Sequence, residues 1–415
     1  MMNSFTFNTR TLLAILFTTT LSASLFAQLE VEPTGTLFTP ENLISNVFLG
    51  DGVEVSNITF QGEDVAVGYF TNGLDDVGMD RGIVMSSGAA TTAATANNGG
   101  GTTGGTSGST VNDPDVNAIM NGNNAQDVAL YEITFVPIND TLRFKYSWAS
   151  EEYPEYACSG FNDAFGFFIS GPGINGPFEN NGQNIAFIPD PSDPSGTTFT
   201  DLPVTINNVN PGVVGANGTL VNCTPPNGSL AYGEYYNDNS GSMTLTYDGI
   251  LDVFIAQVVV IPCEEYTIKL AVADAGDTAF DSAVFLEAKS FGTGSLEVEI
   301  NTVSLDGTLA EGCTPGMLSF SLPNPVEADL FIDYTIFGTA ENGVDYEFIP
   351  EDLFIAAGDS SVSVPINVFE DGITEGIETL GIDVQSDPCN RDTFYLYITE
   401  TELVPPELQN DTTIC

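Results

Sequence analysis

The segment SWASEEYPEYACSGFNDAFGFF, residues 147–168, holds the only tryptophan of the 415-residue chain. RFKYSW, residues 143–148, and AFGFFIS, residues 164–170, both alternate apolar with small or polar residues. That period of two is typical of half-buried strands. Between the two runs lie Glu151, Glu152 and Cys158. The segment therefore predicts a strand, a loop anchored by a cysteine, and a second strand.

Strand-like runs of the same kind recur along residues 28–292, separated by clusters of Gly, Pro, Asn and Asp. About a dozen such runs without a strong amphipathic helix predict an all-β domain, either a jelly roll or a sandwich. Two short helices are expected at residues 39–48 and 113–120, because each begins with a capping residue followed by Pro. Residues 294–403 contain about seven further runs, which predicts a second, immunoglobulin-like sandwich.

The chain carries 57 acidic and 7 basic residues and no histidine, for a formal net charge of −50. This charge argues against binding nucleic acid or an anionic membrane, because phosphate recognition needs clustered Lys and Arg. The lack of histidine excludes Ser-His-Asp and Cys-His catalysis, so we expect no enzymatic activity. The acids have two compatible interpretations: a solubilising surface in a salty extracellular medium, or carboxylates that bind Ca²⁺.

The two ends of the chain differ from the strand-rich regions. Residues 1–27 combine Arg10 with the apolar run TLLAILFTTTLSASLFA, which predicts a secretory signal peptide cleaved after Ala27. No later run is long enough to span a bilayer. We therefore expect an exported protein, extracellular or on the outer cell surface, without direct membrane insertion after signal removal. Residues 404–415 are interpreted as a linker or the start of a further truncated domain, so a downstream anchoring or sorting domain is expected to be missing.

Disulfides are expected for the cysteines, since the protein is predicted to be exported and no CxxC pair is present. Two cysteines of the second predicted domain, Cys313 and Cys389, could pair with each other. The first domain would then hold an odd number, which leaves one cysteine over unless it pairs elsewhere. The pairing stays open for Cys158, Cys223, Cys263 and the terminal Cys415.

Residues 337–384, FGTAENGVDYEFIPEDLFIAAGDSSVSVPINVFEDGITEGIETLGIDV, resemble the Calx-β family. The resemblance rests on a GTA…G-x-DY stretch and an acidic loop that ends in E-x-x-E. It implies a seven-stranded sandwich, used as a structural repeat in many bacterial proteins, whose best-known members bind Ca²⁺ at one end. Calcium-binding members carry three acids where this chain has EDG, so solvated turn acids are the alternative. The ligands implied are Glu311, Asp345, Glu347, Glu370 and Asp371.

Two segments carry a second resemblance: YSWASEEYPEYACSGFNDAFGFFISGPG, residues 146–173, and YTIKLAVADAGDTAFDSAVFLEA, residues 266–288. With them, nearly all of residues 35–292 resemble the choice-of-anchor L domain. The resemblance implies an exported surface protein of gliding Gram-negative bacteria, with anchors or sorting signals that vary at the C-terminus. No catalytic activity is implied.

A second candidate site lies in the first domain. Asp163 and Asp281 each stand just before a small residue and an apolar strand. Such residues often form turns by accepting hydrogen bonds from nearby backbone N–H groups. The alternative is a Ca²⁺ or glycan site with Trp148, Tyr153 and Tyr156 as an aromatic platform. Because Glu151 and Glu152 are adjacent, they would face opposite sides of a strand. The residues of this candidate site are Glu151, Asp163, Asp274, Asp277 and Asp281.

Two functions follow from these observations. The first is a secreted or cell-surface structural protein of adhesin or matrix type, in which Ca²⁺ stiffens the Calx-β module. The alternative is an extracellular carbohydrate-binding protein or a weak glycoside-active enzyme. The partner would be a surface glycan or another surface protein.

Overall fold

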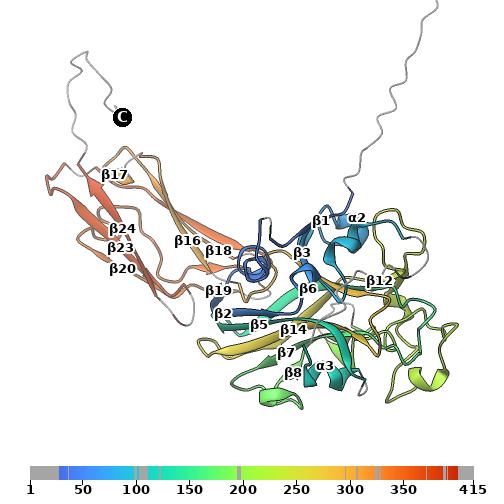
Figure 1. Ribbon diagram of the computed structural model, residues 1–415. Helices are drawn as coiled ribbons and strands as arrows, with labels where there is room; N and C mark the ends of the chain where they lie inside the picture. The colour runs from blue at the N-terminus through green and yellow to red at the C-terminus, as the bar shows by residue number, and fades with distance from the viewer. Residues whose placement is uncertain are drawn as a thin grey trace, which may run out of the picture.

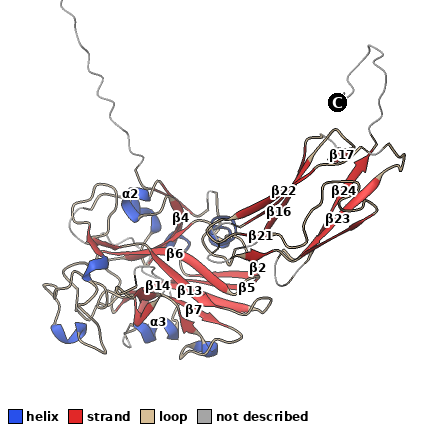
Figure 2. Cartoon of the chain, turned by 180° about the vertical axis from the view of Figure 1, so that it is seen from behind, coloured by secondary structure: helices blue, strands red, loops and turns tan. Residues whose placement is uncertain are grey.

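The computed structural model describes residues 28–35, 37–97, 101, 111–120, 123–193, 198–294, 296–304, 307–322, 326, 329–370, 372–386, 389 and 391–400. Three features expected from the sequence lie outside these residues: the signal peptide at 1–27, the tail at 404–415 with Cys415, and Asp371. Within the described residues the chain is predominantly β-structure, which confirms the predicted all-β class (Figures 1 and 2).

The first unit is a sandwich of two antiparallel sheets. One sheet has five strands in the order β2 (Val53–Gln61), β5 (Ala125–Pro137), β14 (Tyr266–Ala275), β7 (Ala164–Ser170) and β8 (Gln183–Asn184). The other has eight, in the order β1 (Glu30–Pro33), β3 (Val67–Thr71), β4 (Arg81–Ser86), β15 (Ser282–Glu287), β6 (Thr141–Ser150), β12 (Gly249–Leu251) and β11 (Tyr236–Asp238), with β13 (Phe254–Val259) also paired to β6. A separate ribbon joins β9 (Phe187–Pro189) and β10 (Phe199–Pro203).

The core of this sandwich follows from the period of two. Alternate residues of β6, from Leu142 to Trp148, point between the sheets and are buried against alternate residues of β7, from Phe165 to Ile169. The two strands predicted around the tryptophan are therefore present. The residues between them form a loop, which a disulfide between Cys158 and Cys223 ties down.

Both predicted helices are present: the first contributes buried side chains to the core of the sandwich, and the second lies on an outer face. α1 (Pro40–Leu43) is capped by Thr39, whose hydroxyl accepts a hydrogen bond from the backbone N–H of Asn42. It continues into a π-helical turn, η1 (Ile44–Phe48). α3 (Pro114–Ile119) is capped by Asp113 and packs against the outer face of the five-stranded sheet (Figure 1). The remaining helical turns are η2 (Asp64–Ala66), α2 (Leu74–Val77), η3 (Ala90–Ala94), η4 (Glu179–Asn181), η5 (Leu220–Cys223) and η6 (Gly233–Tyr235).

The second unit is a smaller sandwich with its own core. One sheet orders β16 (Glu297–Thr302), β18 (Gly316–Ser321) and β22 (Ser361–Ile366). The facing sheet orders β17 (Thr308–Ala310), β24 (Asp392–Thr399), β23 (Glu378–Val384) and β20 (Tyr334–Gly338), and β17 runs parallel to β24. A short ribbon joins β19 (Leu330–Phe331) and β21 (Phe354–Ile355). The boundaries at 28–292 and 294–403 stay predictions.

The two sandwiches are joined by a disulfide between Cys263 and Cys389. The expected pairing of Cys313 with Cys389 is therefore wrong. Cys389 lies in the turn between β23 and β24, and this turn faces the first sandwich near the backbone carbonyl of Pro137. Cys263 is held at the same place, because its backbone N–H donates to that carbonyl. This pairing depends on the contact between the two units, so the spacing of the cysteines along the sequence could not predict it.

Candidate functional site

The apolar interior of the first sandwich gives way to polar side chains at one end. In each of four chain segments, a residue with a hydroxyl or a carboxylate lies two positions from a buried apolar residue, and therefore on the same side of the strand. These buried polar residues are Ser150 on β6, Ser282 on β15, Asp163 just before β7, and Asp274 on β14. The alternation that fills the core therefore also directs these four side chains inward.

Asp163 connects three strands at this end. Its Oδ1 accepts a hydrogen bond of 2.8 Å from the backbone N–H of Ala275 on β14. Its Oδ2 accepts one of 2.7 Å from the Ser282 hydroxyl, which lies 2.8 Å from the Ser150 hydroxyl. Burial raises the pKa of Asp163 to about 7 despite these two donors. Asp163 thus bonds backbone far away in the sequence, and not the local turn that its position suggested.

Asp274 is buried without any such donor. Its side chain is 1 % exposed, and neither carboxylate oxygen accepts a well-formed hydrogen bond. Burial raises the pKa of Asp274 well above its usual value, and the charges of Asp163 and Asp281 raise it further. A weak hydrogen bond from the nearby Ser87 hydroxyl offsets part of that shift, but no hydrogen bond of ordinary geometry reaches either oxygen. A carboxylate in this state is rare in a folded protein.

Glu151 and Glu152 are both buried, and neither lies on a strand, which corrects the expectation that they face opposite sides of one. β6 ends at Ser150, and the two glutamates occupy the turn that follows, each 2 % exposed. Burial, followed by the charges of Asp163, Asp277 and Glu151, raises the pKa of Glu152 to about 10. Sequence reasoning set Glu152 aside because it assumed a strand, so this member of the site was missed.

Asp281 and Asp277 complete the group, which we call the acidic end: Glu151, Glu152, Asp163, Asp274, Asp277 and Asp281. Asp281 is buried against Gly88, where an added Cβ would lie 1.7 Å from Asp281 Oδ2, so this approach requires glycine. Asp277 is exposed, and its Oδ1 accepts a local hydrogen bond from the backbone N–H of Ala279. The ion pairs between described residues lie elsewhere, at Lys145, Lys269 and Arg391.

The aromatic platform expected beside these acids is wrong. Trp148 and Tyr153 are fully buried. Tyr156 packs against Phe161 and Phe280, with ring centroids 5.6 and 5.2 Å away. The inward positions of β6 take the tryptophan into the core, Tyr153 joins the same core, and the Tyr156 ring packs against two neighbouring rings, so the three do not form an open platform for a sugar.

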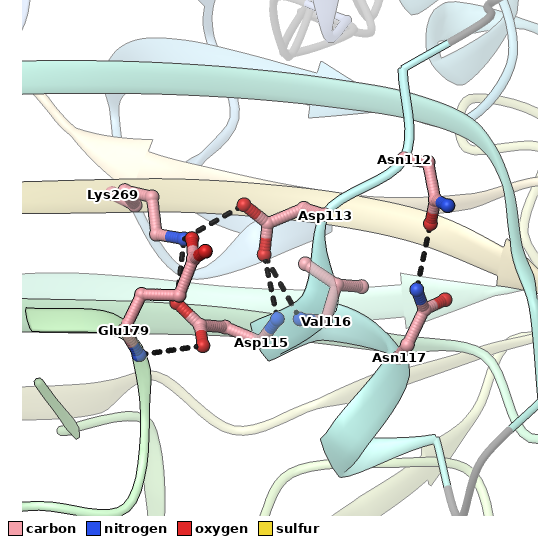
Figure 3. A network of polar contacts seen from close by, with 7 residues as sticks. All are labelled: Asn112, Asp113, Asp115, Val116, Asn117, Glu179 and Lys269. Atoms are coloured by element: carbon pink, nitrogen blue, oxygen red, sulfur yellow. Dashed lines mark hydrogen bonds and ion pairs between the residues drawn. The ribbon is translucent and has the colours of Figure 1, made fainter.

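A second group of acids lies on the outer face of the five-stranded sheet, and it contains a base (Figure 3). The ammonium of Lys269 on β14 lies 2.7 Å from Asp113, 2.5 Å from Asp115 and 3.2 Å from Glu179. Burial lowers the pKa of Lys269, but hydrogen bonds to Asp113 and Asp115 outweigh this effect and raise the pKa above its usual value. These three carboxylates have the spacing of a metal site, but the lysine occupies their centre. We call this group the lysine cage.

Acids of the second sandwich lie at the end farther from Cys389, which we call the outer rim. Carboxylate oxygens of Asp345, Glu375 and Glu378 lie within 4.8 Å of one another. Glu370 lies against Gly312, the residue after the buried Glu311. The backbone of these turns is connected, since Gly312 N–H donates to Val368 and Phe369 N–H donates to Asp345.

The structure therefore brings Glu311, Asp345 and Glu370 onto neighbouring turns. The carboxylate of Glu347 accepts a hydrogen bond of 2.6 Å from the Asn367 side chain, and its role as a ligand stays a prediction. Glu375 and Glu378 are the two acids of the E-x-x-E that ends the Calx-β motif, and they are not among the ligands implied by that resemblance. Their place three residues apart at the start of β23 was the available signal.

Comparisons with known proteins identify the first unit. The family model of the choice-of-anchor L domain matches residues 30–292. Among solved structures, a GH2 β-galacturonidase from Eisenbergiella tayi bound to galacturonate matches with 8 % identity and a TM-score of 0.20, covering 66 % of this chain and 35 % of that chain. Red sea bream transglutaminase matches with 9 % identity and a TM-score of 0.16, covering 66 % and 29 %. The chain thus spans about a third of these structures, and no conclusion follows from such low scores.

No curated protein matches the sequence. Within the described residues, no helix has the length and apolar character needed to cross a membrane. The resemblance of the second sandwich to Calx-β stays a prediction. The family match spans more than half of the chain and implies a secreted or cell-surface protein. This chain belongs to the choice-of-anchor L family.

Proposed function

We propose that this chain is an exported structural protein of adhesin or matrix type, in which Ca²⁺ stiffens the outer rim of a Calx-β sandwich. The observation that carries the calcium role is the approach of Asp345, Glu375 and Glu378, whose carboxylate oxygens lie within 4.8 Å. Carboxylates this close repel one another unless a cation or protons offset their charge. Ca²⁺ suits the rim because it is a hard ion that prefers oxygen ligands.

The rim has further oxygens to offer. Glu311 and Glu370 lie on the adjoining turns, and Asp345 is held in place because its Oδ2 accepts a hydrogen bond from the backbone N–H of Glu341. An ion shared between these turns would tie together segments that otherwise meet through a few backbone hydrogen bonds. The stiffened rim would then transmit load along the sandwich toward the disulfide at its other end.

Hydrogen–deuterium exchange in the rim segment 339–347, with millimolar Ca²⁺ or with chelator, tests this proposal. We expect slower exchange in Ca²⁺, because an ion bound only to the native state suppresses local opening. Asp345→Asn should abolish that protection. The control Glu299→Gln, an exposed acid in the middle of β16, should retain it. Equal exchange in Ca²⁺ and chelator in the unmodified protein would refute the calcium role.

The alternative, carbohydrate binding, is favoured by a different surface. Phe337, Tyr395 and Tyr397 are 41, 57 and 48 % exposed on the outer face of the sheet that contains β20, β23 and β24. The Phe337 ring lies over Gly381, and its centroid is 5.7 Å from that of Tyr395. Exposed aromatic rings of this kind can stack on sugar rings. A glycan array tests this alternative: Tyr395→Ala should lose any binding that the unmodified protein shows.

We propose no catalytic role for the acidic end. A glycosidase needs two carboxyl groups about 5–10 Å apart across a cleft that admits a sugar. Among the six acids only Asp277 is exposed. Turnover of a polysaccharide that is lost in Asp163→Asn would contradict this statement.

A further inference from the structure

The acidic end contains three buried carboxylate oxygens that make no well-formed hydrogen bond. They are both oxygens of Asp274 and Oε2 of Glu152. Burying an ionised carboxylate away from water is costly unless it is paired or coordinates a metal. These oxygens therefore need a partner that the described part of the protein does not supply.

Asp274 is aimed into the group. It shares its side of β14 with Val272 and Leu270, which lie in the core between the sheets. Asp163 reaches the same place from β7, because it bonds the backbone N–H of the residue that follows Asp274. Asp274 and Asp163 thus approach from neighbouring strands, and the charge of Asp163 raises the pKa of Asp274.

We propose that the acidic end binds a hard divalent cation, Ca²⁺ in particular, between Asp274, Glu152 and Asp163. This site is separate from the outer rim and goes beyond the proposed function. The donors are oxygens only, without histidine or thiolate, which favours Ca²⁺ over zinc or copper. Ca²⁺ takes about six to eight oxygen ligands in flexible geometry, and the hydroxyls of Ser150 and Ser282 add to the carboxylates.

Protonation alone is the competing explanation, and the geometry of Asp274 opposes it. A protonated carboxyl still has an O–H group that needs an acceptor. Neither Asp274 oxygen makes a well-formed hydrogen bond with a donor or an acceptor, and the nearby Ser87 hydroxyl also donates to the backbone carbonyl of Ser282. A cation beside Asp163 would lie near both groups, because the charge of Asp163 raises the pKa of Asp274 and the pKa of Glu152. Asp277, the exposed member, marks the side of the group that faces solvent.

The single tryptophan makes this site measurable apart from the rim. Trp148 lies two residues from Ser150 on the same inward side of β6, which is about 6–7 Å along the strand. Bound Tb³⁺, a luminescent substitute for Ca²⁺, emits strongly when an excited tryptophan lies close to it. The outer rim has no tryptophan, because the chain contains only one. Emission after selective tryptophan excitation therefore reports on the acidic end.

We expect the full-length protein to show tryptophan-sensitised Tb³⁺ emission that excess Ca²⁺ displaces. Asp274→Asn should weaken Tb³⁺ binding at least tenfold, and Glu152→Gln should do the same if the first variant folds poorly. Glu54→Gln, an exposed acid on β2, is the matched control and should retain the signal. Asp345→Asn should also retain it, so failure of the rim and failure of this site are distinguishable. Absent emission in the unmodified protein, or unchanged emission in a folded Asp274→Asn protein, would overturn the proposal.

Discussion

Two groups of buried carboxylates lie on opposite faces of β14, and they differ in how their charge is offset. In the lysine cage, Asp113 and Asp115 surround the ammonium of Lys269 (Figure 3). In the acidic end, Asp274 is equally buried but meets other acids. The comparison teaches that a cluster of acids can carry its counter-ion within the chain or require one from outside. We interpret the cage as a structural clamp and the acidic end as a cation site.

Removing the base from the cage should have the largest effect. Lys269→Met would leave Asp113 and Asp115 buried without a cation, so we expect a loss of about 3–5 kcal/mol in the free energy of unfolding. Denaturant unfolding followed by tryptophan fluorescence measures this loss. Lys145→Met is the matched control: Lys145 pairs with Glu287 at the surface, at 3.0 Å, with half of the lysine side chain exposed. There we expect less than about 1 kcal/mol. Equal losses of unfolding free energy in the two variants would contradict the claim that the lysine cage stabilises the fold more than the surface ion pair does.

A smaller effect is expected where backbone approaches the acidic end. The Cβ of Gly88→Ala would lie 1.7 Å from Asp281 Oδ2, so that carboxylate must move. We expect a loss of about 1–3 kcal/mol from overpacking, together with weaker Ca²⁺ binding, measured by unfolding and by calorimetric titration. Gly160→Ala is the control, because its added Cβ meets no atom within 4 Å. Ca²⁺ affinity unchanged in Gly88→Ala would exclude Asp281 from the site.

The fold could be predicted from the sequence because the period of two decides it. The runs around Trp148 and Phe165 alternate so regularly that strand, loop and strand follow, and Thr39 and Asp113 mark their helices by capping. The resemblance to the choice-of-anchor L family was likewise present in local motifs. Local motifs do not indicate contacts between residues that are far apart in the sequence. The partner of Cys389 depends on how two sandwiches meet, which no local pattern contains.

The candidate site was predicted in part, for a related reason. Asp163, Asp274 and Asp281 were recognisable because each stands beside an apolar strand. Glu152 was missed because its direction depends on β6 ending one residue before Glu151. The lysine cage was missed altogether, since Lys269, Asp113 and Glu179 are far apart in the sequence and meet only where α3 packs on the sheet.

The comparison between the two groups is tested most directly by the unfolding free energy of Asp274→Asn, measured with chelator and with saturating Ca²⁺. With chelator, burial keeps Asp274 protonated because it raises the pKa of this carboxyl, so the substitution exchanges one neutral buried group for another. We therefore predict stabilities within about 1 kcal/mol of each other. With Ca²⁺ at about 100 times its dissociation constant, the unmodified protein gains about 2.7 kcal/mol, and a variant that binds at least tenfold more weakly gains at most about 1.4 kcal/mol. This difference in the gain from Ca²⁺ should persist in an Asp345→Asn background, which lacks the rim site. An equal gain from Ca²⁺ in the two proteins would contradict a cation at the acidic end.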